Sequence, residues 1–361
     1  MKIAIVIPTL TLGGAEKVAL ETANELDRIG HNVHVIVMSN KVILTASPNV
    51  TIHEGVDGFF QLAKALKLLK IDYCISYMER ANLFSSVACK IIGITHCATV
   101  HTAPIAGFKM RSRKNRIAIS FTYRLLRFLN TKVVGVSRGI IDDLNKLYGI
   151  KNSYVVPNFI DVNEIEQFSK EKEQIEAYDY VFVGRLSKIK GCHVLIEALA
   201  NIKAQGKINK IRVAVVGDGP EYNQISQLIT QYGLQKNVHL IGARINPYPY
   251  MLNAAAIIVP SFAEGFGMVV LEALSLGRKV IFSRCDFGPK EIIDTNFAEF
   301  SHLGFKNPSD DLAASISELA TILVNEVENK TVYDKSFVRF KVEANYNKQI
   351  ICKLLLDVLE R

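Results

Sequence analysis

The sequence predicts an α/β protein made of two Rossmann-like domains, each a doubly wound parallel sheet, that face each other across a cleft. Apolar runs typical of buried strands alternate with helix-period patterns along the chain. The chain has 361 residues, which is long for one core and suits two domains. In three places an apolar run leads through a glycine-containing turn into a helix pattern. Such turns put free helix N–H groups at the end of a strand.

Strands are expected in both halves of the chain. In the first half they are expected near 2–8, 33–38, 72–77, 97–101, 132–136 and 153–157, and in the second near 179–184, 211–217, 237–241, 255–260 and 279–283. Between the halves, 161–178 is charged and poor in large apolar residues, which indicates a linker or an exposed helix. We therefore expect domains at 1–165 and 166–342, followed by an amphipathic helix at about 343–361.

The composition argues against a membrane-spanning protein, a secreted protein and a cysteine-based metal site. No stretch reaches the ~18 consecutive apolar residues that would cross a bilayer, and residues 1–10 lack the pattern of a signal peptide. The six cysteines show no metal-ligand spacing. Because most of them lie in apolar patterns, we expect reduced core thiols in a cytoplasmic protein.

Glu264 and Glu272 are the most informative pair of residues. They flank the turn at Gly265–Gly267, after an apolar run at 254–260 that predicts a buried strand, and the helix is expected to continue through Leu276. The free N–H groups of Phe266, Gly267, Met268 and Val269 can bind phosphate or sugar oxygens. Eight helical residues span at most ~12 Å, about the reach of a nucleotide sugar. The alternative is one solvated glutamate in a loop and one on a helix face.

Two cations occupy an equivalent turn. Arg185 and Lys190 follow the strand pattern that ends at Val183 and Gly184, and a helix is expected from His193. An arginine fork and a lysine point charge together bind a diphosphate better than either alone. The third turn, Gly13–Gly14, follows the first strand and lets a ligand approach without a Cβ in the way.

These motifs resemble those of retaining glycosyltransferases of the GT-B fold, in glycosyltransferase family 4 of the bacterial polysaccharide and lipid-linked glycan type. The resemblance covers residues 1 to about 295. Its motifs, in the family's order, are Gly-Gly-Ala-Glu at 13–16, Val-Ser at 136–137, Val-Pro-Asn-Phe-Ile-Asp at 156–161, Gly184-Arg185 with Lys190-Gly191, Gly-Asp-Gly-Pro at 217–220, and the Glu264/Glu272 pair.

The resemblance implies a role for each of these positions. Glu264 would hold hydroxyls of the donor sugar and Glu272 the ribose, while backbone around Gly242 to Arg244 would accept the base. His101, at the carboxyl end of a strand, is expected near the donor sugar, although a lone histidine there is more often structural. In similar proteins the last helix commonly crosses back onto the first domain.

We expect no metal and no other cofactor. The chain has no Asp-x-Asp motif of the kind that metal-dependent glycosyltransferases use, and the pairs Asp142-Asp143 and Asp310-Asp311 do not supply one. Arg185, Lys190 and the helix amino terminus would stabilise the leaving diphosphate instead. Similar retaining enzymes lack a well-placed nucleophile, so Glu264 is not assigned as one.

The first domain carries the excess of positive charge. Residues 1–165 have 20 Lys and Arg against 12 Asp and Glu, whereas residues 166–361 have 23 of each. Segment 108–129 interleaves seven cations with large apolar residues. It predicts a surface that lies on an anionic membrane, with a lipid-linked saccharide as acceptor, at the cytoplasmic face of the inner membrane. The alternatives are a core-packed helix with a solvated basic face and, less well supported, nucleic-acid binding, because no nucleic-acid module accompanies the segment.

The sequence indicates a nucleotide sugar as the donor but does not identify its base or its sugar. A UDP-hexose or UDP-N-acetylhexosamine is favoured, and GDP-mannose is an alternative. A sugar-nucleotide epimerase shares the fold but needs no acceptor. A non-catalytic binding protein is disfavoured because Arg185, Lys190, Glu264 and Glu272 are all present.

Overall fold

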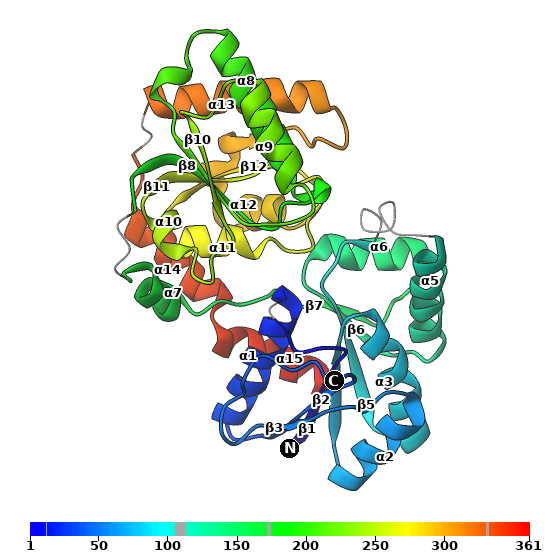
Figure 1. Ribbon diagram of the computed structural model, residues 1–361. Coiled ribbons are helices and arrows are strands. Elements are labelled where there is room, and N and C mark those ends of the chain that lie inside the picture. Colours follow the sequence, from blue (N-terminus) through cyan, green and yellow to red (C-terminus); the bar gives the residue numbers. More distant parts are fainter. Residues whose placement is uncertain (12, 105–112, 172–174, 330–331) are drawn as a thin grey trace. The chain divides into compact units, whose positions relative to one another are not determined.

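Helices and strands alternate along the chain in the computed structural model, which describes residues 1–11, 13–104, 113–171, 175–329 and 332–361. The chain divides into two units (Figure 1). The first comprises Met1–Phe159 together with Lys348–Arg361, and the second comprises Ile160–Asn347. Each unit is built around its own parallel sheet, so the predicted fold class, two doubly wound α/β domains, is confirmed.

The described residues of the first unit form a seven-stranded sheet in the order β3-β2-β1-β4-β5-β6-β7. Neighbouring strands are parallel. The order reverses at β1, which has β2 on one side and β4 on the other. The strands are β1 Lys2–Ile7, β2 Asn32–Val37, β3 Thr51–His53, β4 Tyr73–Tyr77, β5 Thr95–Val100, β6 Lys132–Gly135 and β7 Ser153–Val155.

Apolar side chains on both faces of this sheet build the core of the first unit. Side chains alternate along a strand, so β1 sends Ile3, Ile5 and Ile7 to one face and Ala4 and Val6 to the other. The first face packs against α1 and α15, and the second against α2 and α3. The helices of this unit are α1 Gly14–Arg28, α2 Phe59–Leu69, α3 Glu79–Ile92, α5 Arg113–Phe128, α6 Arg138–Tyr148 and α15 Lys348–Glu360.

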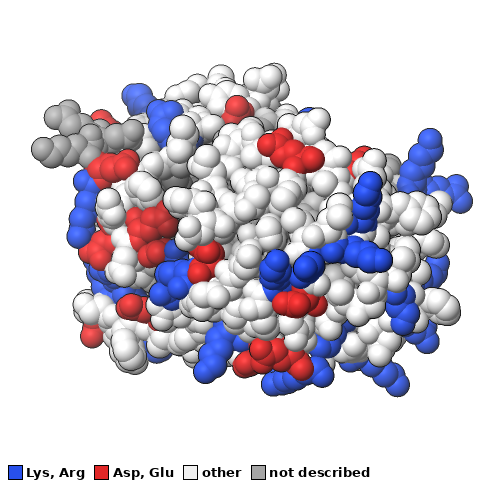
Figure 2. Space-filling model, turned by 90° about the horizontal axis from the view of Figure 1, so that it is seen from below, with Lys and Arg blue, Asp and Glu red and all other residues white. Residues whose placement is uncertain are grey.

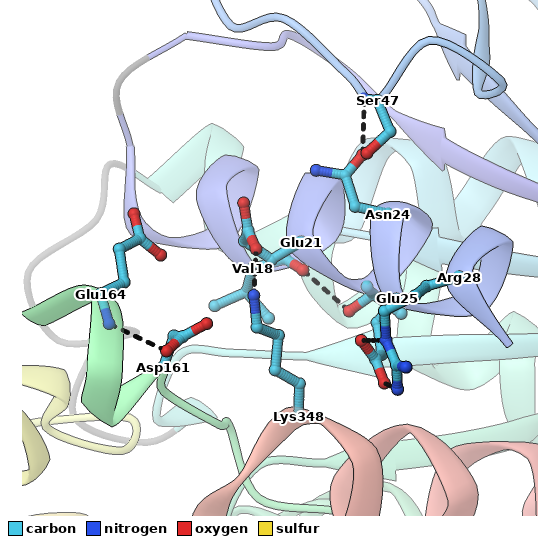
Figure 3. Close-up of polar contacts among 10 residues, drawn as sticks. Val18, Glu21, Asn24, Glu25, Arg28, Ser47, Asp161, Glu164 and Lys348 are labelled. Atoms are coloured by element: carbon cyan, nitrogen blue, oxygen red, sulfur yellow. Dashed lines mark hydrogen bonds and ion pairs between the residues drawn. The ribbon is translucent and has the colours of Figure 1, made fainter.

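The C-terminal helix, α15, belongs to the first unit. Near its start Lys348 donates a hydrogen bond of 3.1 Å to Glu21 of α1, as Figure 3 shows. At its other end the ammonium of Lys132 donates to the carbonyl oxygens of Val358 and Leu359, at 3.0 and 2.9 Å. A cation is favourable there because the last carbonyls of a helix lack partners within the helix.

The described residues of the second unit form a six-stranded sheet in the order β10-β9-β8-β11-β12-β13, again with parallel neighbours. Here the order reverses at β8, which lies between β9 and β11. Open parallel sheets bind ligands at such a reversal, beyond the carboxyl ends of the strands. The strands are β8 Tyr178–Val183, β9 Val213–Val216, β10 Val238–Gly242, β11 Ala254–Val259, β12 Lys279–Ser283 and β13 Gly304–Phe305.

Short helices follow most strands of the second unit and position its loops. The 3-10 helices are η1 Lys188–Lys190, η2 Ile208–Lys210 and η3 Ala298–Leu303. The α-helices are α7 Val162–Ser169, α8 Cys192–Ala204, α9 Tyr222–Gln231, α10 Tyr248–Leu252, α11 Met268–Ser275, α12 Pro289–Asn296, α13 Leu312–Glu328 and α14 Lys335–Tyr346.

The charged segment between the halves forms a helix at its start. The side chain of Asp161 accepts a 3.0 Å hydrogen bond from the backbone N–H of Glu164 and so caps α7 (Figure 3). Helix α7 packs against α10, α11 and α14 of the second unit. The boundary that we expected after residue 165 falls inside this helix, whereas the two units divide between Phe159 and Ile160.

Every strand expected from an apolar run is present, but β3 and β13 were not predicted. They have three and two residues, and each lies at an edge of its sheet. Such short segments cannot show the alternation by which a strand is recognised in a sequence. The six cysteines are free and buried, in agreement with their apolar sequence contexts. No helix among the described residues is long and apolar enough to span a membrane.

Candidate functional site

The loops after β8 and β11 lie next to each other because these two strands are neighbours in the sheet. Lys190, at the end of η1, places its ammonium 2.7 and 2.8 Å from the two carboxylate oxygens of Glu264. The hydroxyl of Ser261 donates to the same carboxylate at 2.7 Å. The side chain of Glu264 is 9% exposed and that of Lys190 is 33% exposed. The two residues therefore form a half-buried ion pair at the point where the strand order reverses.

Glycines let these loops pack backbone against backbone. A Cβ on Gly191 would lie 2.0 Å from the carbonyl oxygen of Pro260, and one on Gly217 would lie 1.9 Å from that of Gly184. Gly191 and Gly217 also have φ values of +68° and +153°, which disfavour other residues. The β8, β9 and β11 loops are thus held at a fixed, close spacing.

Arg185 lies in the loop after β8, and its side chain is exposed. Its guanidinium has no hydrogen-bond or ion-pair partner among the described residues. A cation at the rim of a loop cluster, without a structural partner, is available to an anionic ligand.

Helix α11 begins at Met268, and Gly267 is its N-cap with φ +91° and no side-chain cap. The N–H of Val270 is bonded to the carbonyl of Gly267. Met268 and Val269 are half-buried, whereas the Phe266 side chain is buried with its ring edge-on to Tyr346. Phe266 can therefore contribute to the site by its backbone, and the amino end of α11 presents N–H groups beside Glu264.

Glu272 lies one turn along α11 and contacts Tyr248 of α10. Burial raises the pKa of the Tyr248 phenol, and the neighbouring Glu272 carboxylate raises it further. A phenol kept protonated in this way can donate to the carboxylate. Arg244, in the loop after β10, is exposed, and its guanidinium contacts the carbonyl of Ala243 at 3.3 Å.

In the first unit, the loop after β1 is organised around Glu16. This carboxylate is buried and accepts hydrogen bonds from the hydroxyls of Thr9 and Thr11, at 2.8 and 2.9 Å. A Cβ on Gly13 would lie 1.9 Å from the Glu16 carboxylate, whereas one on Gly14 would meet nothing within 4 Å. A Cβ at position 13 would therefore displace the Glu16 carboxylate, whereas Gly14 has open space around it.

His101 follows β5 and is held from two sides. Its Nε2 lies 3.0 Å from the hydroxyl of Thr99, and its ring stacks on Tyr77 with centroids 5.2 Å apart. Burial lowers the pKa of His101 to about 4, against a smaller opposing effect of the Asn158 side chain. The ring is therefore neutral near pH 7.

Helix α5 contains the described part of the basic segment, since residues 108–112, with Lys109 and Arg111, lie outside the described residues. Ile119, Tyr123 and Leu126 are buried, so one face packs as an ordinary core helix. The opposite face exposes Ile117, Phe121 and Phe128 by 65%, 58% and 84%. These three are spaced to fall in one stripe of the helix.

Cations flank this apolar stripe. Arg113, Lys114 and Arg124 are exposed on α5. Helix α3 packs against both α5 and α2, so these three helices lie on one side of the first unit. Figure 2 shows that blue side chains predominate over red on the right of that view, the side on which Figure 1 draws α2, α3 and α5. The outer face of α5 is therefore both basic and apolar.

The predicted site residues thus fall into two groups. The second unit brings together Gly184, Arg185, Lys190, Glu264, Phe266 to Val269 and Glu272 around the β8 and β11 loops, with Arg244 on the β10 loop. Gly13, Gly14 and His101 lie in the first unit. Sequence reasoning did not single out Ser261, Tyr248 or Thr99, and it named Glu16 only as part of the Gly-Gly-Ala-Glu motif. Among the described residues, no group of three or more His, Cys, Asp and Glu side chains is arranged to hold a metal ion.

Two protein-family models match the chain. The model described as Glycosyltransferase Family 4 matches residues 12–164, and the model described as Glycosyl transferases group 1 matches residues 163–327. The first therefore ends, and the second begins, close to the division between the two units.

Curated relatives are glycosyltransferases at low identity. The chain is 25% identical over 358 residues to an N-acetylgalactosamine-N,N'-diacetylbacillosaminyl-diphospho-undecaprenol 4-alpha-N-acetylgalactosaminyltransferase of Campylobacter jejuni, covering 94% of this chain and 95% of the relative. It is 26% identical over 251 residues to an uncharacterized glycosyltransferase of Methanocaldococcus jannaschii, covering 65% of this chain. In that second case the match spans less than two thirds, 61%, of the relative's length.

The fold is shared with solved structures. The crystal structure of Anabaena Alr3699/HepE in complex with UDP matches with a TM-score of 0.78 at 20% identity, covering 100% of both chains. Likeness at this identity speaks for the fold. With two consecutive family models over both sheet units and a full-length match to this fold, the chain belongs to the glycosyltransferases of the GT-B fold, family 4 type, and is a transferase enzyme.

Proposed function

We propose that this enzyme is a retaining glycosyltransferase that moves a hexose or an N-acetylhexosamine from a UDP-sugar to a lipid-linked saccharide, in the synthesis of a cell-surface polysaccharide, O-antigen or lipopolysaccharide. The observation that carries the proposal is the Lys190–Glu264 pair at the strand reversal, with Arg185 exposed in the loop after β8 that leads to Lys190. Two cations and two acceptor carboxylates at one sheet edge suit a ligand with a diphosphate between two hydroxyl-bearing sugars.

The diphosphate is stabilised by Arg185, Lys190 and the amino end of α11. Negative charge on the leaving group grows as the anomeric bond breaks, and fixed cations and N–H groups lower the energy of that state without reorganising. No metal ion or other cofactor is assigned to this step. Lys190 already has an anionic partner in Glu264, so bound diphosphate shares its ammonium with that carboxylate.

The two glutamates recognise the two sugars of the donor. Glu264, held by Lys190 and Ser261, accepts hydrogen bonds from hydroxyls of the transferred sugar. Glu272 accepts them from the ribose, and backbone around Arg244 contacts the base. For Gly13, Gly14 and His101 of the first unit, we propose roles toward the sugar and the acceptor on the family resemblance alone.

The reaction exchanges one glycosidic oxygen for another on the same face of the sugar. The bond from the anomeric carbon to the diphosphate oxygen breaks with its electron pair on the diphosphate. The acceptor hydroxyl forms the new bond, and its proton passes to the departing phosphate oxygen. No covalent enzyme intermediate is invoked, and the anomeric configuration is retained.

Two of the similar proteins support the proposed donor and acceptor. The Anabaena structure was solved with UDP, and the Campylobacter jejuni relative is named for transfer to an undecaprenol-diphosphate saccharide. With a lipid-linked acceptor, we propose that the enzyme works at the cytoplasmic face of the inner membrane. The outer face of α5 supports this, because exposed Ile117, Phe121 and Phe128 can enter the headgroup boundary while flanking cations meet anionic lipids.

A panel of nucleotide sugars tests the activity. We expect a UDP-hexose or UDP-N-acetylhexosamine to raise the melting temperature, and transfer to a polyprenyl-diphosphate saccharide to proceed in EDTA with an α-linked product from an α-linked donor. Loss of activity on chelation, or an inverted product, argues against the mechanism. Stabilisation by GDP-mannose instead identifies a mannosyltransferase, and isomerisation of a UDP-sugar without acceptor identifies an epimerase.

Cosedimentation with vesicles tests the membrane surface. Changing Ile117, Phe121 and Phe128 to Ser, or Arg113, Lys114 and Arg124 to Gln, should weaken binding to anionic vesicles, as should added salt, because exposed charges are screened within roughly 8 Å at physiological ionic strength. Phe337→Ser with Phe340→Ser, and Lys207, Lys236 and Lys290 changed to Gln, are matched controls on the second unit, where all five side chains are exposed. If wild type does not bind, or if all variants bind alike, the membrane surface on α5 is ruled out and a soluble acceptor is favoured.

A further inference from the structure

A chain of buried polar groups connects the ends of β4 and β5. The hydroxyl of Thr99 donates to the backbone carbonyl of Ser76 at 2.8 Å. A carbonyl oxygen can only accept, and a threonine hydroxyl has one proton to give. The proton of Thr99 is therefore committed to Ser76, and its oxygen is left to accept.

The hydrogen bond from Thr99 to Ser76 determines which ring nitrogen of His101 carries the proton. Its Nε2 lies 3.0 Å from the Thr99 oxygen, so Nε2 must carry the proton and donate it. Stacking on Tyr77, with rings 22° from parallel, opposes rotation of the imidazole, and the Tyr77 hydroxyl is itself tied to Thr22 at 3.0 Å. In the neutral ring, Nδ1 then carries no proton and can only accept a hydrogen bond.

Nδ1 of His101 is buried and makes no hydrogen bond of normal geometry among the described residues, although the side chain of Asn158 lies near enough to the ring to raise its pKa. The ring lines a crevice of the first unit together with Tyr77, Thr99, Pro157 and Asn158. The crevice has a volume of about 20 Å³, which is enough for about one water molecule. A buried acceptor without a partner costs free energy until a donor reaches it.

We propose that Thr99 is a positioning residue that holds His101 as the neutral Nε2–H tautomer, so that His101 offers only a hydrogen-bond acceptor, at Nδ1, to an O–H group in this crevice. The O–H group is a water or a hydroxyl of the bound sugar. A phosphate oxygen is itself an acceptor and is excluded from this position. The sugar hydroxyl rests on the proposed function, whereas the tautomer does not.

Long-range ¹H–¹⁵N correlation of the histidine rings in the full-length protein tests the tautomer, with His101→Gln to assign the signals. We expect the Nε2–H form in wild type and in Thr99→Ser, and a mixture of tautomers in Thr99→Val, which keeps the shape but removes the hydroxyl. Tyr77→Phe controls for disturbance of the buried core and should leave the tautomer unchanged. An Nδ1–H form in wild type, or an unchanged tautomer in Thr99→Val, overturns the proposal.

The source of the O–H group follows from the ¹⁵N shift of Nδ1. A shift that moves with a UDP-sugar but not with UDP identifies a sugar hydroxyl, and a hydrogen-bonded shift present without ligand identifies a water. An Nδ1 shift typical of a free lone pair in every state overturns the assignment.

Kinetics separate this proposal from the proposed function. Thr99→Val should lower kcat roughly 10-fold, within the range for a lost positioning contact, and Thr99→Ser should restore most of it. If no nucleotide sugar supports transfer by wild type, the proposed function fails, whereas the tautomer result stands by itself.

Discussion

The ammonium of Lys190 bridges both carboxylate oxygens of Glu264, at 2.7 and 2.8 Å, and so ties the loop after β8 to the loop after β11. The pair joins the two strands at which the sheet order of the second unit reverses. One ion pair thus both holds two loops together and presents the charges that we assign to the donor.

Lys190→Ala should lower both stability and activity. The Glu264 carboxylate is 9% exposed and would keep Ser261 as its hydrogen-bond partner. Leaving a buried acceptor partly unpaired costs about 1–3 kcal/mol, and loss of one fixed donor to a developing anion should lower kcat by at least ~10²-fold. Thermal melting and steady-state kinetics measure the two effects. Glu264→Ala should be similarly severe in kcat, and additive effects in the double variant would show that the pair is not coupled.

Arg185→Ala should separate function from folding. Its side chain is exposed and has no partner among the described residues, so its removal should change stability by less than about 0.5 kcal/mol. We expect kcat to fall by at least ~10²-fold, because the cation meets the leaving diphosphate. Lys188→Ala, an exposed cation of the same loop, is the matched control and should retain activity. Equal activity in both variants would remove Arg185 from the reaction.

Glu272→Ala should act through the KM of the donor more than through kcat. The ribose changes little between ground and transition state, so a contact to it contributes equally to both. Tyr248→Phe removes the phenol that contacts Glu272 and should raise the KM less. Donor affinity measured by calorimetry checks this. Unaltered donor binding in Glu272→Ala would show that the ribose assignment is wrong.

Gly217→Ala should destabilise the second unit more than Gly206→Ala. Both glycines have positive φ, at +153° and +74°, so both substitutions strain the backbone. A Cβ on Gly217 would lie 1.9 Å from the Gly184 carbonyl oxygen, whereas one on Gly206 meets nothing within 4 Å. Comparison of the two melting temperatures measures the cost of separating the β8 and β9 loops. Equal losses would mean that the loops move apart freely.

Stability should fall with acid through His96. Burial lowers the pKa of His96 from 6.5 to about 3, and its Nε2 lies 2.7 Å from the hydroxyl of Ser76. Between pH 6.5 and about pH 3, His96 is protonated in the unfolded chain but neutral in the folded protein. The free energy of unfolding therefore has its full value above pH 6.5 and decreases as the pH falls toward about 3. Denaturant melts at about pH 7 and about pH 5 should show a smaller loss for His96→Gln than for wild type. The exposed His302→Gln should follow wild type, and a wild-type-like loss in His96→Gln would contradict the assignment.

The sequence by itself determined the fold class, most of the strands and the candidate binding and catalytic residues. Apolar runs, glycine turns and helix-period patterns are local signals, and each was readable around Glu264 and Arg185 because burial imposes a period on nearby residues. Motif order along the chain then indicated the family. The short edge strands β3 and β13 carried too few residues for any such period.

Only the tertiary structure decided which side chains become hydrogen-bond or ion-pair partners. Nothing local to Lys190 or Glu264 tells that they meet, because their 2.7 Å contact follows from β8 and β11 being neighbours in the sheet. The proton of Thr99, and with it the tautomer of His101, depends in the same way on β4 lying beside β5. Strand order is set by the sum of many packing and hydrogen-bond terms across the sheet, so the partner of a charged side chain is a property of the folded chain.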